Sequence, residues 1–248
     1  MDDVQIILIN LNSDTERLSR ISARLGQMGL DYVRMPAVEG KSLEINGGIF
    51  NEAAFRRNMG KFTNKNEIAC YLSHYEALKL FLKSGKKHGL ILEDDMVFNS
   101  DFRKVLESVL ALDFRWDFIK FNAASDKGLG NVKVCGLFGK YKLVASLFSK
   151  KKSGAYIVNR KAAESLVEKL LPMTVPFDHE MVKFYKYNIR QYSVFPSPSE
   201  EEKRGSSIGG YGKKKSKFPF YRRVSVFFYR YFYIMPLRLF YFGRLLGR

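Results

Sequence analysis

The sequence predicts an α/β fold with a mostly parallel central sheet flanked by helices. Short runs rich in Val and Ile alternate with amphipathic helical segments, a pattern typical of parallel strands joined by right-handed crossovers. The first run, VQIILIN, is rich in β-branched apolar residues, as expected for a strand buried on both faces. With 248 residues and 46% hydrophobic side chains, the chain is long enough to bury a complete core.

The N-terminal part of the sequence predicts a strand, a helix and a second strand. The first strand is expected at residues 4–10. A helix follows over about residues 13–29, because Ser13 and Glu16 form a capping-box pattern and apolar residues recur at helical spacing up to Gly29. The segment LDYVRMPAVEG then predicts a strand closed by a turn.

The middle and C-terminal parts continue the alternation of helices and strands. A short helix is expected at about residues 52–58, a longer one in NEIACYLSHYEALKLFLKSG, and another over about residues 101–112. The last two predicted helices lie in RKAAESLVEKLL and FDHEMVKFYKYN. Strand-like segments are HGLILEDDMVF, WDFIKFN, NVKVCGLF, YKLVASLF, GAYIVN and IRQYSVFPSPS.

Positive charge is concentrated at the C-terminal end of the chain. The formal net charge is +17, and residues 213–248 carry ten Lys or Arg and no Asp or Glu. Subtracting these ten charges from +17 leaves +7 on residues 1–212, an ordinary surface charge for a domain. We therefore predict an α/β domain over residues 1–212 and a basic tail over residues 213–248.

Aromatic side chains stand between the basic residues of this tail. Nucleic acid could stack on them, but no RNP motif, helix-turn-helix or zinc knuckle accompanies the pattern, so a nucleic-acid-binding protein is the alternative and not the expectation. At an anionic membrane surface, the rings would enter the headgroup boundary while Lys and Arg meet the lipid charges. The residues predicted to contact a membrane are Lys213, Lys214, Lys215, Arg222, Arg223, Phe227, Phe228, Tyr231 and Phe232.

Cysteine usage and hydropathy indicate the compartment. Cys70 and Cys135 are far apart and form no CxxC pair, which favours a reducing, cytoplasmic setting. The N-terminus has no signal-peptide pattern, and no apolar run approaches the roughly 18 to 20 residues of a membrane-spanning helix. We expect a cytoplasmic protein that is peripheral to a membrane.

Three consecutive carboxylates, Glu93, Asp94 and Asp95, follow the third predicted strand. They fall at the carboxyl edge of a parallel sheet, where open α/β folds bind ligands. A divalent cation such as Mn²⁺ or Mg²⁺ prefers oxygen ligands and would compensate the mutual repulsion. Glu93 and Asp95 are therefore predicted metal ligands, with a substrate diphosphate supplying further oxygens. The alternative is a solvated strand end.

Two other acidic or basic sites are candidates for chemistry. His74 shares a helix face with Glu67 and Cys70, although a lone helical His is more often structural. Asp178 in PFDHEM is either a helix N-cap or a general base that takes a proton from an acceptor hydroxyl, and Glu180 is the second candidate for that base. Several other functions lack their motifs, because the chain contains no GxGxxG, GxxxxGK[ST] or HExxH.

These motifs together resemble glycosyltransferase family 25, in particular its bacterial lipooligosaccharide galactosyltransferase group. The resemblance covers about residues 4–210 and leaves the tail outside. Its most specific part is the combination of EIACYLSH with EDD at this spacing. It also includes ILINLNSDTERL, MPAVEG, SGAYIVNRKAAESL and PFDHEM.

The resemblance implies a GT-A-like nucleotide-sugar fold and a metal-assisted transfer of galactose from UDP-galactose. The acceptor would be a lipid-linked oligosaccharide of the lipooligosaccharide or lipopolysaccharide core, and the product a β linkage, expected to be β-1,4, formed with inversion. Such an enzyme would work on the inner face of the bacterial inner membrane. The alternative within this class is another UDP-sugar, carrying glucose or N-acetylglucosamine.

The resemblance also assigns residues. The acidic group Glu93, Asp94 and Asp95 matches the family's metal and donor site. The residues that would face the nucleotide-sugar are Asn10, Arg17, Ala37, Val38, Ser73, His74 and Asp94. The assignment of Asp178 as the base is not implied by the resemblance and rests on the argument above.

Overall fold

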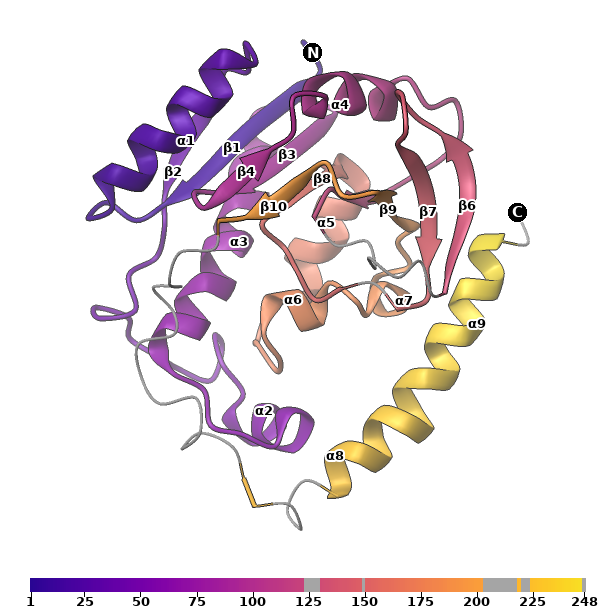
Figure 1. Cartoon of the computed structure of the whole chain (residues 1–248). Helices are drawn as coiled ribbons and strands as arrows, with labels where there is room; N and C mark the ends of the chain where they lie inside the picture. The colour runs from indigo at the N-terminus through magenta and orange to yellow at the C-terminus, as the bar shows by residue number, and fades with distance from the viewer. Residues whose placement is uncertain (123–129, 149, 203–217, 220–223, 247–248) are drawn as a thin grey trace.

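The computed structural model describes residues 1–122, 130–148, 150–202, 218–219 and 224–246 (Figure 1). Eight strands form one sheet: β1 (Val4–Asn10), β2 (Val33–Pro36), β3 (His88–Glu93), β5 (Phe118–Lys120), β6 (Asn131–Gly136), β7 (Lys142–Ser146), β8 (Ala155–Asn159) and β9 (Gln191–Phe195). Their order across the sheet is β2-β1-β3-β8-β5-β9-β7-β6. Only β7 and β8 run against the common direction of the other six strands. The predicted α/β class with a mainly parallel sheet is confirmed.

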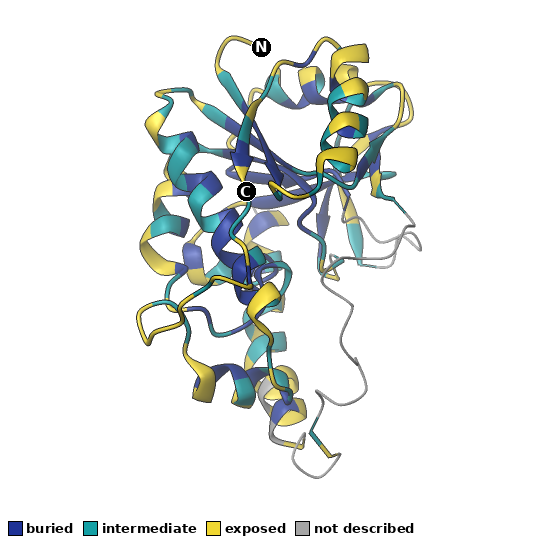
Figure 2. Cartoon of the chain, turned by 90° about the vertical axis from the view of Figure 1, so that its left-hand side faces the viewer, coloured by how far each residue is buried: buried dark blue, intermediate teal, exposed yellow. Residues whose placement is uncertain are grey.

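Helices cover both faces of the sheet. The helices of the described residues are α1 (Thr15–Gln27), α2 (Glu52–Met59), α3 (Lys65–Lys83), α4 (Phe102–Leu110), α5 (Arg160–Lys169), α6 (Phe177–Glu180), α7 (Phe184–Tyr187), α8 (Val224–Phe228), the π-helix η3 (Tyr229–Ile234) and α9 (Met235–Leu246). Ile21 of α1 and Phe102 of α4 pack in one hydrophobic cluster, while Tyr71 of α3 and Ala163 of α5 pack in the other. The buried sheet lies between these layers (Figure 2).

The apolar residues of β1 explain why helices must cover the sheet on both faces. Alternate residues of a strand point to opposite faces. Accordingly, Ile6 and Leu8 belong to the cluster with α1 and α4, whereas Ile7 and Ile9 belong to the cluster with α3 and α5. All four are buried, so a strand with a polar face would not satisfy this position.

The structure corrects three local predictions. The α1 helix begins after Asp14 and not after Ser13, because the Asp14 carboxylate accepts the hydrogen bond from the Arg17 backbone N–H at 3.2 Å. The third predicted strand is two elements, since β3 ends at Glu93 and the chain turns through Asp94 and Asp95 into β4 (Met96–Phe98). That short strand leaves the main sheet and pairs antiparallel with β10 (Ser199–Glu201).

The third correction concerns FDHEMVKFYKYN, which forms the single turns α6 and α7 and no continuous helix. Phe177, Val182 and Tyr187 are all buried. At 100° per residue, these three positions would be spread around the whole circumference of one helix. Breaking the helix allows all of them to be buried at once.

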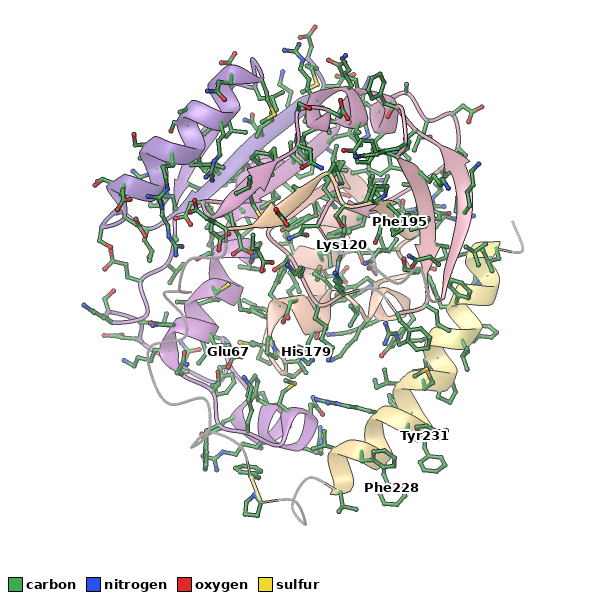
Figure 3. The ribbon with its side chains drawn as sticks, in the orientation of Figure 1. Glu67, Lys120, His179, Phe195, Phe228 and Tyr231 are labelled. Carbon is green, nitrogen blue, oxygen red and sulfur yellow. The ribbon has the colours of Figure 1, made fainter. Side chains whose placement is uncertain are left out.

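The C-terminal segment runs along one side of the molecule as a rod formed by α8, η3 and α9 (Figure 1). Tyr241 and Leu245 belong to the cluster that includes α1 and α4, and the Tyr241 hydroxyl is 3.1 Å from Asn188 Oδ1. Phe228 and Tyr231 point away from the domain (Figure 3), and both are exposed, as are Phe227 and Phe232. Lys213, Lys214, Lys215, Arg222 and Arg223 lie outside the described residues.

Among the described residues, no helix combines the length and the apolar character that a membrane span requires. Segments of the tail and of the domain share one hydrophobic cluster. The division of the chain at residue 212 stays a prediction.

Candidate functional site

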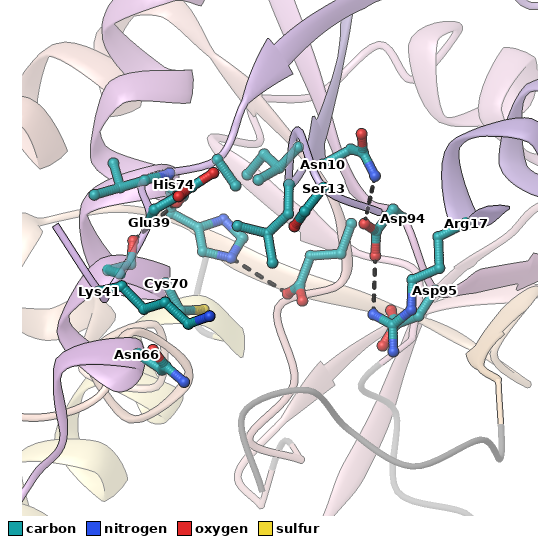
Figure 4. A pocket seen from close by; sticks show the side chains of 18 residues that line it. Asn10, Ser13, Arg17, Glu39, Lys41, Asn66, Cys70, His74, Asp94 and Asp95 are labelled. Atoms are coloured by element: carbon teal, nitrogen blue, oxygen red, sulfur yellow. Dashed lines mark hydrogen bonds and ion pairs between the residues drawn. The ribbon is translucent and has the colours of Figure 1, made fainter. Parts of the chain in front are cut away.

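A cavity of about 310 Å³ lies at the carboxyl edge of the sheet (Figure 4). Strands β2, β1 and β3 are parallel neighbours, so their carboxyl ends meet there, and α3 supplies the opposite wall. Nine of the predicted site residues line this cavity: Asn10, Arg17, Ala37, Val38, Ser73, His74, Glu93, Asp94 and Asp95. Residues far apart in the sequence are thus brought to one place, as a ligand site at this edge requires.

Asp94 is held in place by two side chains from the first β-α connection. Its Oδ2 accepts a hydrogen bond from Asn10 Nδ2 at 2.8 Å, and its Oδ1 is 3.2 Å from Arg17 Nη1. Burial raises the pKa of Asp94, while Asn10 and Arg17 oppose that rise by stabilising the carboxylate. Because both oxygens are engaged, Asp94 anchors the turn between β3 and β4.

Asp95 has the opposite environment. Its Oδ1 is buried and has no hydrogen-bond partner in the part of the chain that the structure describes. Burial raises the pKa of Asp95 to about 7, and the nearby carboxylates of Glu93, Asp94 and Glu201 contribute to the rise. A buried carboxylate oxygen that lines a cavity needs a water, an ion or a ligand as its partner.

The side chain of Glu93 lies beside Asp95 and contacts His74. Its Oε1 is 3.3 Å from His74 Nε2 and 3.3 Å from Ser153 Oγ. Burial would raise the pKa of Glu93, but the hydrogen bonds to His74 and Ser153 and the charge of Arg17 help to leave that pKa below its ordinary value. Glu93 is therefore an ionised carboxylate in contact with the cavity.

The donor set of this cavity fits a hard divalent cation that shares its coordination with a substrate. Glu93 and Asp95 offer carboxylate oxygens, the ligands that Mg²⁺ and Mn²⁺ prefer. Within the described ranges, no group of three or more His, Cys, Asp or Glu side chains is arranged to hold a metal. Two carboxylates would leave the remaining coordination positions to substrate and water, which is usual for Mg²⁺ bound with a diphosphate.

His74 is packed as firmly as a core residue. Its side chain is 1% exposed, and its Nδ1 is 3.3 Å from the Tyr156 hydroxyl. The neighbouring Ser73 hydroxyl donates to the Ala69 carbonyl at 2.8 Å and accepts from the Val38 N–H at 2.9 Å. Ser73 thus holds the loop after β2 against the cavity, while His74 holds Glu93.

The two candidate bases do not line the cavity. Asp178 is partly buried, and its Oδ1 accepts from the His179 N–H at 2.8 Å. Burial raises the pKa of the cavity-lining Cys70 thiol, and the charges of Glu93 and Asp178 raise it further, so both carboxylates lie near the same cysteine. Burial likewise raises the pKa of Asp178.

Glu180 differs from Asp178 in its contacts. It is 1% exposed and pairs with Lys183 at 3.0 Å and with Lys186 at 2.8 Å. The Tyr187 hydroxyl also donates to it. A carboxylate that is saturated in this way is a structural group, so Asp178 is the remaining candidate for the base.

Sequence reasoning missed the residues that support His74. Tyr156 was predicted only as part of a strand, and Phe177 only as part of a helix. Tyr156 reaches the site because β8 inserts beside β3, where it is paired with Ile91. No local spacing signals that pairing. The motif PFDHEM was the one available hint for Phe177.

Comparisons with known proteins point to one family. The model for "Glycosyltransferase family 25 (LPS biosynthesis protein)" matches residues 3–181. A glycosyltransferase 25 family member of Anopheles gambiae is 31% identical over 185 residues, which are 70% of this chain and 30% of that protein. Procollagen galactosyltransferase 1-A of Xenopus laevis is 27% identical over 213 residues, covering 79% of this chain and 33% of that protein. The chain thus spans about a third or less of these relatives' length.

Two other similarities are weaker in coverage or in sequence identity. A protein of Rattus norvegicus named probable inactive glycosyltransferase 25 family member 3 is 27% identical over 146 residues, or 54% of this chain and 25% of that protein. The crystal structure of a glycosyltransferase involved in glycosylation of the major capsid of PBCV-1 has a TM-score of 0.44 and 15% identity, over 83% of this chain and 94% of that one. The latter likeness is too weak to carry an argument.

Proposed function

Because the chain belongs to glycosyltransferase family 25, we propose that it transfers a hexose from a UDP-sugar to an acceptor hydroxyl. The donor sugar we propose is galactose, the sugar in the name of the Xenopus relative. The acceptor we propose is a lipid-linked oligosaccharide of the lipooligosaccharide or lipopolysaccharide core, joined with inversion in a β-1,4 linkage. The bacterial subgroup is part of this proposal, since the relatives described above are animal proteins.

The single observation that carries the proposal is the buried Asp95 Oδ1, which lies beside Glu93 in the cavity and has no hydrogen-bond partner among the described residues. A UDP-sugar brings a negatively charged diphosphate, which two carboxylates alone would repel. The same carboxylates attract the diphosphate when a divalent cation lies between them. A UDP-sugar and Mn²⁺ or Mg²⁺ are therefore expected to bind together and not independently.

Other residues of the cavity would position the nucleotide. Asn10 and Arg17 hold Asp94 and so fix the turn that presents Glu93 and Asp95. Ala37 and Val38 border the cavity at the end of β2, where Ser73 anchors their loop. When bound, the cation would neutralise the negative charge that grows on the leaving diphosphate.

The chain's own proton acceptor in this proposal is Asp178. As the acceptor oxygen forms its bond to the sugar C1, the bond from C1 to the UDP oxygen breaks, and Asp178 takes the hydroxyl proton. The raised pKa of Asp178 suits this role, because a base works best when its pKa approaches the working pH. Inversion requires the base and the leaving group on opposite sides of the sugar.

A lipid-linked acceptor would explain the exposed aromatic side chains on the C-terminal rod. Phe227, Phe228, Tyr231 and Phe232 are more than half exposed on α8 and η3, and such a patch marks an interaction surface. We propose that these rings enter an anionic membrane surface on the cytoplasmic face of the bacterial inner membrane. Attachment would concentrate enzyme and acceptor in two dimensions.

The test is the metal dependence of transfer from UDP-galactose, measured for the wild type and for Asp95→Asn. We expect activity to disappear with EDTA, to return with Mn²⁺ or Mg²⁺, and to stay low in Asp95→Asn. The matched control is Asp113→Asn, which changes an exposed aspartate away from the cavity. Full activity without metal and in Asp95→Asn would refute the proposed role of the acidic cluster.

Two outcomes would lead to other assignments. A panel of UDP-sugars tests the donor, since turnover with UDP-glucose or UDP-N-acetylglucosamine but not UDP-galactose would replace galactose. Binding of UDP-sugar without turnover would indicate an inactive protein, as the name of the Rattus relative suggests for that protein.

A further inference from the structure

A further acidic side chain, Glu201, lies close to Asp95 but does not line the donor cavity. Glu201 is the last residue of β10 and is paired with Met96 across the ribbon that β4 and β10 form (Figure 1). The next residue, Glu202, donates its backbone N–H to the Asp95 carbonyl at 2.8 Å. The proximity of the two carboxylates is also seen in the pKa of Asp95, which the charge of Glu201 helps to raise.

The segment before β8 connects Glu201 to the other predicted metal ligand, Glu93. Lys152 Nζ is 3.2 Å from Glu201 Oε2. The next residue, Ser153, places its Oγ 3.3 Å from Glu93 Oε1. The carbonyl of Gly154 accepts a hydrogen bond from the Glu93 N–H at 2.8 Å. Three consecutive residues thus bridge the carboxylates of Glu93 and Glu201 and hold them in one neighbourhood.

Asn122, two residues beyond the end of β5, supports Glu201 from the core. Its side chain is buried, and its Nδ2 is 3.5 Å from Glu201 Oε1. The backbone approaches closely here, because a Cβ added to Gly154 would lie 2.5 Å from Met96 Sδ and 3.1 Å from Asn122 Nδ2. Asn122 Oδ1 is buried and has no hydrogen-bond partner among the described residues. Such unsatisfied amides are rare in a closed core, so this one indicates a polar site.

The pair of Glu201 and Lys152 is accessible to a ligand and is carried by a rigid ribbon. The two side chains are 40% and 32% exposed. Arg24 of α1 holds the ribbon in place, since its Nη1 donates to the Met96 carbonyl at 2.9 Å and its Nη2 to Glu202 Oε1 at 3.0 Å. An ion pair that is exposed to this extent contributes little to stability. Its fixed position beside the predicted metal ligands therefore favours a binding role.

The strand order separates this pair from the part of the cavity assigned to the nucleotide. Strand β3, which ends at Glu93, lies between β1 and β8, and β5 follows β8. The donor cavity extends from Glu93 toward β1 and β2, whereas Ser153 before β8 and Asn122 after β5 lie on the other side of β3. In a UDP-sugar, the diphosphate separates the uridine from the sugar. A diphosphate held at Glu93 and Asp95, with its uridine in the cavity, therefore directs the sugar toward β8 and β5.

We propose that Glu201 and Lys152 bind hydroxyl groups of the donor hexose, with Asn122 and Ser153 as positioning residues. This inference rests on the proposed function. A carboxylate accepts hydrogen bonds from sugar hydroxyls, and an ammonium group donates to their oxygens, so the pair can recognise a pattern of hydroxyls. A site that hydrogen-bonds a hydroxyl rejects the analogue that lacks it, because the polar groups of the site are then left unpaired. Glu201 and Lys152 thus contribute to the choice of the sugar.

The experiment measures the binding of donor analogues to the full chain by isothermal titration calorimetry, with Mg²⁺ and without acceptor. The ligands are UDP, UDP-galactose and its 2-, 3-, 4- and 6-deoxy analogues. In the wild type, we expect at least one deoxy analogue to bind about 10-fold or more weakly than UDP-galactose, as the loss of a hydrogen bond to a charged group implies. Glu201→Ala should remove this difference, and Lys152→Ala should reduce it. Glu200→Ala is the matched control, because Glu200 is the exposed neighbour in β10, and it should keep the difference.

The Kd of UDP separates this inference from the proposed function. UDP carries no hexose, so its Kd should be the same in the wild type and in the three variants, which also shows that the variants are folded. Equal binding of UDP-galactose and all deoxy analogues to the wild type would overturn the inference. The same differences in Glu201→Ala and Lys152→Ala as in the wild type would also overturn it. A wild type that does not bind UDP would refute the proposed function, and this inference with it.

Discussion

The imidazole of His74 lies parallel to the ring of Phe177, with centroids 4.1 Å apart and planes 1° apart. The same imidazole is 3.3 Å from Glu93 Oε1 and 3.3 Å from the Tyr156 hydroxyl. Phe177 directly precedes Asp178, so one stacked pair connects the segment of the proposed base to the proposed metal ligand. Partners that orient a metal ligand in this way affect catalysis through that ligand.

We therefore predict that His74→Ala lowers kcat by about 10- to 100-fold, the range found for residues that orient metal ligands. The reason is that Glu93 loses the contact that holds its Oε1. Steady-state kinetics with UDP-galactose at saturating metal would measure the effect. The matched control is His88→Gln, because His88 stacks on Trp116 at 4.9 Å and does not line the cavity. An equal loss in both variants would indicate general destabilisation.

Asp94 and Asp95 are adjacent but should respond to the same substitution by different amounts. Asp95→Asn removes a buried charge and its repulsion from Glu93, Asp94 and Glu201, so the metal-free protein should gain roughly 1 kcal/mol in the free energy of unfolding. Asp94→Asn also removes a buried charge, but it weakens the contact with Arg17 and should leave the free energy of unfolding nearly unchanged. Urea unfolding at pH 8 with EDTA would measure both, and an equal gain in the two variants would contradict this account.

The burial of His179 leads us to predict how the free energy of unfolding falls at acidic pH. Its folded pKa is lowered to about 3 from the ordinary value of 6.5, so between these values the unfolded chain binds a proton that the folded chain does not. The stability contributed by neutral His179 is present above about pH 6.5 and is lost as the pH falls toward 3.

The corresponding variant is His179→Gln, which does not titrate. Its free energy of unfolding should fall less than that of the wild type between pH 7 and pH 4, by about 2 kcal/mol after discounting for partial exposure. Chemical denaturation at several pH values would measure this difference. Parallel curves for the two proteins would show that His179 is not buried as a neutral group.

The C-terminal rod should bind membranes through aromatic side chains that do not contribute to the stability of the domain. Phe228 and Phe232 are 53% and 66% exposed, and their rings stack with centroids 5.6 Å apart. Replacing both by Ser should weaken binding to phosphatidylglycerol vesicles by at least about 10-fold, since burying each ring in lipid is worth about 1.5 to 3 kcal/mol. Vesicle sedimentation would measure the affinity.

The free energy of unfolding provides the control for this prediction. The double Ser variant should unfold as the wild type does, because both rings point into solvent. Tyr241→Phe should do the reverse, with a loss of about 1 kcal/mol in stability and unchanged vesicle binding, since it removes the contact with Asn188. Unchanged vesicle binding in the double variant would refute the membrane assignment.

Local sequence pattern was sufficient to predict the fold class and the acidic cluster at the carboxyl edge of the sheet. The apolar run of β1, the periodicity of α3 and the position of three acids after β3 each depend on neighbouring residues alone. Periodicity reports which residues are buried, and parallel strands that begin a fold bring their carboxyl ends together. The acidic cluster was expected at this edge for that reason, the resemblance to the family added Asn10 and Ser73, and all three parts do line one cavity.

Long-range pairing decided the rest, because it depends on the packing of the whole chain and leaves no local signal. Strand β8 runs antiparallel between β3 and β5, which places Tyr156 against His74 and closes Lys120 into the interior. The burial of Phe177, Val182 and Tyr187 divides one predicted helix into two turns. The sequence by itself thus determined the elements and the acidic edge, while only the tertiary structure decided which side chains support the acids and that Lys120 is buried, because both depend on the order of the strands in the sheet.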